Sequence, residues 1–352
     1  MRIPNSFFLL AILITAFSFG CKDDDQQFAD CFNEPKKPKL NLTLIEGPTV
    51  SLPSKVSVFF RVRDDNGNPV GYLTEDNFVI YEKGLNDPCP RIISEFEAKR
   101  KISGREQVFN HTTMLLLDLS GSVLQQSLAN LQNAAIAFID ETMPDTIDNS
   151  IKMGIWWFDG EDILHELEAP TSDIWELKAA VNSITPNISN DNSTDLYGAV
   201  IKGAAIAEQI LADYQNQDVS SAVSVVLFTD GEDRANRYLK QDAYNAVAAT
   251  PADISWFTLG VGNEINIPDL KTIGRNGFFQ AASISQLTAV FKQLALVVNN
   301  EANSFYLFEY CSPIRNGANN ELVIEAFDIQ GNESGFLKTT FDATGFTSGC
   351  QL

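Results

Sequence analysis

Histidine and basic side chains are both scarce in this chain of 352 residues, and each scarcity excludes a class of function. The only two histidines are His111 and His165, so neither a histidine-rich zinc site nor a histidine-assisted nucleophile is expected. Lysine and arginine number 25 against 46 acidic residues, which gives a formal net charge of −21. A field of that sign repels nucleic-acid phosphates, so no nucleic-acid partner is expected.

Cysteine is also rare, and no two cysteines have the CxxC spacing of a zinc or redox motif. Apart from Cys21, the cysteines are Cys31, Cys89, Cys311 and Cys350, an even set outside the central part of the chain. In an exported protein such a set predicts two disulfides, and three pairings are open. Each pairing would tie the flanks of the chain rather than its centre.

Long apolar runs are absent except for Phe7 to Phe19, which is too short to cross a bilayer comfortably. Arg2 precedes this run and Gly20-Cys21 follows it, so the sequence predicts a secretory signal peptide over residues 1–20. Gly20-Cys21 resembles the lipobox of bacterial lipoproteins, which implies a lipid on Cys21. Ordinary cleavage that leaves a free cysteine is the alternative.

The charged stretch Lys22-Asp23-Asp24-Asp25 resembles the tags that direct bacterial lipoproteins to the cell surface. Residues 21–40 are therefore interpreted as a lipidated N-terminus and linker. The resemblance implies a protein of the cell envelope, anchored in the outer membrane, with the surface and the periplasmic face both open. Contact with the membrane is expected only through the N-terminal lipid.

Both flanks of the chain have the two-residue periodicity of strands with one buried face. Apolar residues alternate over Lys55–Arg63, and Asp65-Asn66-Gly67-Asn68 follows as a predicted tight turn. A calcium loop there is rejected because no glutamate closes it. Three further strands are expected near the C-terminus, at Phe305–Tyr310, Leu322–Phe327 and Phe336–Phe341. We predict one small β-sandwich-like domain in two parts, residues 41–108 and 301–352, with two separate small domains as the alternative.

Residues 109–300 alternate between short apolar stretches and stretches of helical periodicity. Ala222–Phe228 is apolar nearly throughout, as in a parallel strand that is buried on both faces. Leu287, Phe291, Leu294 and Val298 recur at helical spacing and predict a last helix. This alternation predicts an α/β fold, a doubly wound and mostly parallel sheet with helices on both faces.

Residues with oxygen-bearing side chains stand at the ends of two predicted strands and just before one predicted helix. Asp118-Leu119-Ser120-Gly121-Ser122 ends the first strand, Thr194 precedes an alanine-rich helix, and Asp230 ends the strand at Phe228. The carboxyl ends of parallel strands meet at one edge, where ligands bind. Two carboxylates and three hydroxyls suit Mg²⁺, Mn²⁺ or Ca²⁺ rather than zinc. Helix capping by Ser120 or Ser122 is the alternative.

These residues resemble the metal-ion-dependent adhesion site of the von Willebrand factor type A (VWA) family. The resemblance covers roughly His111 to Val298, although Asn192-Ser193 stands where the family often has glycine before the threonine. It implies a metal bound by the Asp118 loop, Thr194 and Asp230. A glutamate or aspartate carboxylate from a protein ligand would complete the coordination.

The expected function is that of a cell-envelope-anchored binding module, an adhesin or receptor that holds a protein ligand through the metal. No general base is evident among the site residues, so the chain is not expected to be an enzyme. The alternative is a non-catalytic scaffold subunit of an envelope assembly, in which the metal is only structural.

Overall fold

The computed structural model describes residues 38–352 except 104–108, 146, 148, 218–219 and 333. The predicted signal peptide, the predicted lipidation site Cys21 and the disulfide candidate Cys31 therefore lie outside the described residues. None of the helices among the described residues is long and apolar enough to cross a membrane.

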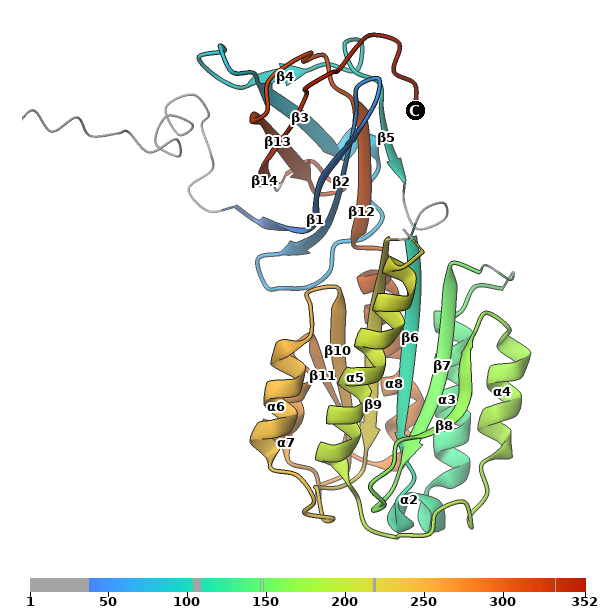
Figure 1. The fold of residues 1–352 in the computed structure, drawn as a ribbon. Coiled ribbons are helices and arrows are strands. Elements are labelled where there is room, and N and C mark those ends of the chain that lie inside the picture. Colours follow the sequence, from blue (N-terminus) through green and yellow to red (C-terminus); the bar gives the residue numbers. More distant parts are fainter. Residues whose placement is uncertain (1–37, 104–108, 146, 148, 218–219, 333) are drawn as a thin grey trace, which may run out of the picture. The chain divides into compact units, whose positions relative to one another are not determined.

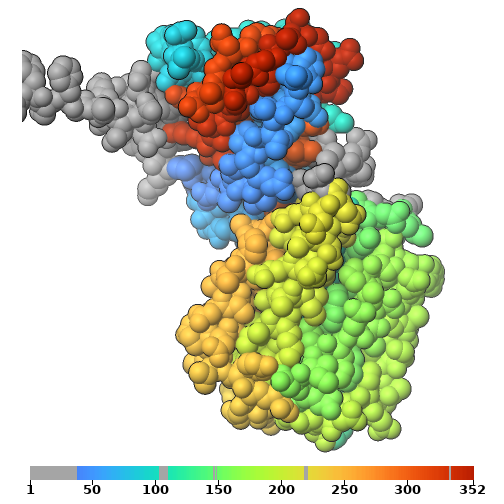
Figure 2. All heavy atoms as spheres, viewed as in Figure 1, coloured from blue at the N-terminus to red at the C-terminus, as the bar shows by residue number. Residues whose placement is uncertain are grey.

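Two four-stranded antiparallel sheets form a sandwich from both ends of the chain (Figure 1). The first sheet has the order β1-β2-β12-β5 and the second the order β14-β13-β3-β4. Their bounds are β1 Leu40–Ser51, β2 Lys55–Asp64, β3 Phe78–Lys83, β4 Arg91–Ile93, β5 Arg100–Ser103, β12 Phe305–Cys311, β13 Asn320–Phe327 and β14 Ser334–Phe341, with the short 3-10 helix η1 at Glu75–Asn77. Strands from both flanks thus pair directly in both sheets. Figure 2 shows the N-terminal strand β1, in blue, beside the C-terminal strands, in red.

The alternating pattern of β2 explains how the two sheets join. Val56, Val58, Phe60 and Val62 are fully buried and pack in the core between the sheets. Phe60 meets Phe78 of the second sheet edge to face, with ring centroids 5.8 Å apart. This burial of one strand face is the main stabilising contribution to a sandwich.

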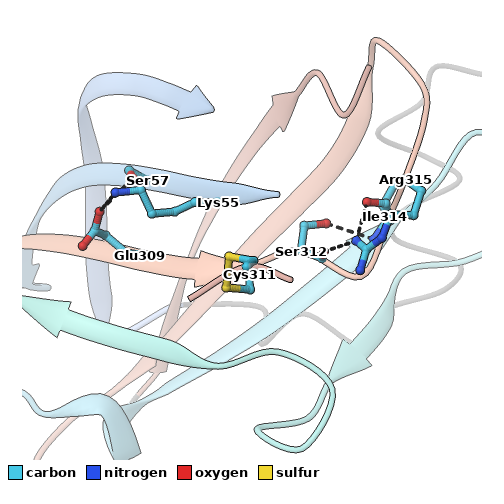
Figure 3. The surroundings of a disulfide bond; sticks show 8 residues. Lys55, Ser57, Glu309, Cys311, Ser312, Ile314 and Arg315 are labelled. Carbon is cyan, nitrogen blue, oxygen red and sulfur yellow. Dashed lines mark hydrogen bonds and ion pairs between the residues drawn. A yellow bond between two sulfur atoms is a disulfide. The ribbon is translucent and has the colours of Figure 1, made fainter. Parts of the chain in front are cut away.

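A disulfide ties the C-terminal segment to the first sheet. Cys311, at the end of β12, is bonded to Cys350 (Figure 3). Beside it, Glu309 accepts hydrogen bonds from Lys55 and Ser57 of β2 (Figure 3). Cys89 is also disulfide-bonded. The Cys311–Cys350 bond agrees with one of the three predicted pairings.

The segment between β5 and β12 forms a six-stranded sheet of order β11-β10-β9-β6-β7-β8, in which only β8 runs antiparallel to its neighbour. The strands are β6 Phe109–Asp118, β7 Ile151–Phe158, β8 His165–Thr171, β9 Ser220–Thr229, β10 Ile254–Val261 and β11 Gly277–Ala281. The helices are α2 Gly121–Gln126, α3 Leu128–Thr142, α4 Ile174–Ser183, α5 Leu196–Gln215, α6 Lys240–Ala249, α7 Ile267–Ile273 and α8 Leu287–Ala302, with the 3-10 helix η2 at Ile284–Gln286. The predicted fold class is confirmed.

Helices cover both faces of this sheet, and each face has its own apolar core (Figure 1). Helices α3, α4 and α8 pack on one face, where Phe291 of α8 contacts Phe138 of α3 and Phe228 of β9. Helices α5, α6 and α7 pack on the other face. The central strands β6 and β9 are therefore covered on both sides, and only their ends are free to carry a site.

Candidate metal site

Three loops meet at the carboxyl end of the central strands because β6 pairs with both β7 and β9. The first loop is Asp118–Ser122, which leads from β6 into α2. The second loop is Ile188–Asp195, which leads into α5, and the third loop is Thr229–Ala235, which follows β9. This is the edge at which open parallel sheets bind ligands.

The first and third loops are joined through their side chains. Asp118 is fully buried, and its two oxygens accept hydrogen bonds from the backbone N–H of Ser120 at 2.9 Å and the hydroxyl of Thr229 at 2.6 Å. The Ser122 hydroxyl donates to Asp230 Oδ1 at 2.9 Å and lies 3.4 Å from that of Ser120. Four of the five predicted residues are therefore in direct contact.

The serine side chain at the start of α2 does not cap that helix. Ser120 occupies the N-cap position of α2, but its side chain makes no capping hydrogen bond. It is 1% exposed and its hydroxyl faces that of Ser122. The Ser122 hydroxyl is thus directed toward the Asp230 carboxylate, and the Ser120 hydroxyl toward Ser122, rather than to the helix backbone.

The fifth residue, Thr194, is tied to the third loop through its backbone. Its carbonyl accepts hydrogen bonds from the N–H groups of Arg234 at 2.9 Å and Ala235 at 3.0 Å. Thr194 is 4% exposed, and the next residue, Asp195, caps α5 by accepting from the Gly198 N–H. The helix start therefore fixes where the Thr194 side chain lies.

A fully buried carboxylate, Asp118, and a half-buried one, Asp230, lie close together at this edge. Burial raises the pKa of Asp118 from 3.8 to about 7, and the negative charge of Asp230 adds to the rise. Burial also raises the pKa of Asp230, while the Ser122 hydroxyl opposes that rise. A divalent cation would offset the repulsion, and the all-oxygen donor set is the kind that Mg²⁺, Mn²⁺ and Ca²⁺ accept. The residues present therefore fit a hard cation.

Sequence reasoning did not single out two residues that hold these loops, Thr229 and Asp159. Thr229 orients Asp118 through the hydrogen bond described above. Asp159 directly follows β7 and is fully buried. The signal for both was their position at the carboxyl end of a buried strand, which Asp118 and Asp230 share. Asp233 is structural, because it accepts from the N–H groups of Tyr197 and Asn236.

A second group of metal-ligand residue types lies nearby. Asp159, Glu161 and His165 each place one ligand atom within 4.8 Å of the others. His165 is the first residue of β8, in the hairpin that β8 forms with β7, and its ring stacks on Trp157 with centroids 4.0 Å apart. Its Nε2 atom is 3.5 Å from the Glu161 carboxylate.

No family model matches the sequence, and no curated protein matches it. Solved structures of similar fold are VWA-type proteins. They include a von Willebrand factor type A protein from Catenulispora acidiphila, with 10% identity, a TM-score of 0.46 and coverage of 87% of this chain and 74% of that chain. The VWA domain of the pilus tip protein Mfa5 from Porphyromonas gingivalis has 14% identity, a TM-score of 0.39 and coverage of 55% and 96%.

Proximal thread matrix protein 1 from the mussel byssus, in a structure with a zinc-occupied MIDAS motif, has 14% identity and a TM-score of 0.44. The match covers 55% of this chain and only 49% of the mussel protein. At these identities and TM-scores the similarity carries no argument about ligands. The case for a metal site rests on the residues themselves.

Proposed function

We propose that this chain is an envelope-anchored binding module that holds a divalent cation with Asp118, Ser120, Ser122, Thr194 and Asp230 and binds a carboxylate of a protein partner through it. The observation that supports the proposal best is the cluster at the carboxyl edge of the sheet, in which two serine hydroxyls lie beside a fully buried carboxylate, Asp118, and a half-buried one, Asp230. A buried carboxylate beside a second negative charge is unfavourable without a cation, so this arrangement is better explained as a binding site than as a structural one.

The contacts of each residue indicate what it contributes to the proposed site. Both oxygens of Asp118 already accept hydrogen bonds, so Asp118 supplies charge and orients the first loop. Ser120, Ser122 and Thr194 offer neutral hydroxyl oxygens. A cation held mainly by neutral groups keeps a positive charge, which attracts an incoming carboxylate. Mg²⁺, Mn²⁺ and Ca²⁺ are the candidate cations.

Metal binding is tested by thermal unfolding of the full chain with each of the three cations. A cation at a free concentration of about a hundred times its Kd adds about 2.7 kcal/mol to the unfolding free energy. We expect this shift in the parent, none in Asp118→Ala, and an unchanged shift in Glu232→Gln, a matched control at an exposed carboxylate of the third loop. A parent that shows no shift with any cation contradicts the proposal.

Carboxylate binding is tested with acetate as the probe. In the Mn²⁺-loaded protein, acetate should displace water from the ion and lower the water-proton relaxation rate, whereas an uncharged amide of the same size should not. Metal binding without an acetate effect would favour the alternative of a scaffold with a structural metal.

The anchoring part of the proposal depends on residues 1–21. A signal peptide over 1–20 and a lipid on Cys21 would place the protein at the outer membrane, as the lipobox-like Gly20-Cys21 indicates. Mass spectrometry of the mature N-terminus tests this point. A lipid on Cys21 supports anchoring, and an unmodified N-terminus contradicts it.

A further inference from the structure

The second loop is the least regular part of the candidate metal site, yet it presents one of the five residues. It lies between α4 and α5, and Thr194 stands near its end. No helix or strand lies between Ser183 and Leu196, so contacts from neighbouring segments must fix the position of the loop.

One residue of the neighbouring strand holds this loop at both ends. Asp159 Oδ2 accepts from the Ser189 hydroxyl at 2.6 Å and from the Asp191 N–H at 3.4 Å. The backbone carbonyl of Asp159 accepts from the Asp195 N–H at 2.7 Å. Asp159 thus attaches the beginning of the loop and the residue directly after Thr194.

Two glycines let the loop approach the sheet closely. A Cβ at Gly160 would overlap the Ser193 hydroxyl and the Asp191 carboxylate, and a Cβ at Gly121 would come within 2.9 Å of Asn192. The Gly160 N–H donates to Asp191 O at 3.2 Å, and the Gly121 N–H donates to Asn192 O at 3.1 Å. The loop is therefore held between the ends of β6 and β7 on either side.

The carboxylate of Asp159 is fully buried. No lysine or arginine forms an ion pair with it among the residues that the structure describes. A buried charge is unfavourable unless hydrogen bonds satisfy it. Here one oxygen accepts from the Glu161 N–H at 2.8 Å, and the other accepts only from the second loop, from Ser189 and Asp191.

We propose that Asp159 is a positioning residue of the candidate metal site, which sets the place of Thr194 by holding the second loop against the end of β7. This inference rests on the proposed function. Residues that orient metal ligands from outside the coordination sphere typically change metal affinity by about 10–100-fold when they are removed.

The test measures the Kd and stoichiometry of Mn²⁺ for variants of the full chain, together with their unfolding without metal. Asp159→Ala should weaken Mn²⁺ binding by about 10–100-fold. Ser189→Ala should weaken it less, because the bonds from Glu161 and Asp191 remain. Asp159→Asn should restore most of the affinity, since its amide can donate to Ser189, whose hydroxyl also lies 3.0 Å from Asp191 O.

Glu82→Gln provides the matched control for loss of a buried carboxylate. Glu82 is 1% exposed in the sandwich and accepts from Tyr310, so this variant should lose stability and keep the parent's Mn²⁺ affinity. If Asp159→Ala does not fold, Ser189→Ala and Asp159→Asn still test the positioning role of Asp159. The inference is overturned if the Kd of Ser189→Ala for Mn²⁺ lies within twofold of the parent's. It is also overturned if Asp159→Asn no longer binds Mn²⁺.

The nearby group of Asp159, Glu161 and His165 offers a competing explanation, in which Asp159 is itself a metal ligand. Two Mn²⁺ per chain, reduced to one by Glu161→Gln, would show this and overturn the positioning role. A parent that binds no Mn²⁺ refutes the proposed function and this inference together. If the parent binds Mn²⁺ and Asp159→Ala binds it with the same Kd, only the inference is refuted.

Discussion

At the scale of single residues, the environment of Asp118 strongly changes its acid–base behaviour. It is fully buried at the end of a central strand, and the negative charge of Asp230 acts on it. Its pKa is raised to about 7, so near neutral pH the metal-free protein holds Asp118 partly protonated. Proton and cation therefore compete for the same carboxylate.

A pH dependence follows with a definite sign. Because the folded pKa exceeds the unfolded value, Asp118 contributes stability below about pH 4 that is lost as the pH rises through about 7. Without metal, the unfolding free energy of the parent should fall more steeply over this range than that of Asp118→Asn. Urea unfolding in EDTA at several pH values measures both slopes.

The same competition predicts that cation affinity rises with pH up to about 7 and then levels off. The Thr229 hydroxyl can donate to Gly231 O, 3.2 Å away, in Asp118→Asn, so this variant should keep its fold. Equal slopes for parent and variant would show that the pKa of Asp118 is not raised.

The sequence points to the candidate metal-site residues because each has an oxygen-bearing side chain at the end of a predicted strand or just before a predicted helix. It does not point to the residues that hold them. Asp159 and Thr229 act through hydrogen bonds between loops that are distant in sequence, and a local sequence pattern does not indicate such contacts.

At the scale of elements, the end of α8 makes an unusual junction with β2. Glu301 is fully buried, and both of its oxygens accept from Arg63 at 2.6 Å. Ser255 of β10 donates to it at 2.6 Å, and Arg61 at 3.3 Å. One carboxylate thus joins a helix of the α/β sheet, its strand β10 and the sandwich.

Removing one partner of such a buried group leaves an uncompensated charge. We expect Arg63→Ala and Glu301→Ala each to lower the unfolding free energy by about 3–5 kcal/mol. The double variant should lose less than the sum, with a coupling of about 0.5–3 kcal/mol. Urea unfolding of the four proteins measures this cycle.

The Lys292–Glu141 pair is a matched control on the same helix. Its atoms are 2.9 Å apart, but the side chains are 52% and 40% exposed. Its coupling should be about 0–1 kcal/mol, because solvent screens the charges. Equal coupling for the two pairs would mean that burial does not strengthen the Arg63–Glu301 contact.

The sequence predicted the long helices and buried strands but not the small or edge elements. The edge strand β8 has charged residues and Pro170 in place of an apolar pattern, and α7 has only seven residues. The predicted last helix stopped at Val298 because the residues after it are polar. The structure continues it to Ala302, since Glu301 finds its partners on β2, which is distant in sequence.

At the scale of the whole molecule, the sandwich is complete without the segment between its two parts. Both sheets consist of strands β1–β5 and β12–β14, and every buried residue of the core between them comes from the same flanks. The chain leaves the sandwich after β5 and returns in β12, and these two strands are hydrogen-bonded neighbours, with Ser103 opposite Leu307. The ends of the α/β segment therefore lie close together, as insertion into a loop requires.

This arrangement predicts that the sandwich folds without the insert. Replacing residues 104–304 with a short glycine-containing turn should leave one cooperative urea transition and an intact Cys311–Cys350 bond, because both sheets and their core are retained. Stability should be lower than in the full chain, since Arg63 and Phe59 lose their contacts with Glu301 and Ala222. Mg²⁺, Mn²⁺ and Ca²⁺ should no longer shift the transition. A chain that retains strand content by circular dichroism but shows no cooperative transition would mean that the α/β segment is required to order the sandwich, and that the two regions form one folding unit.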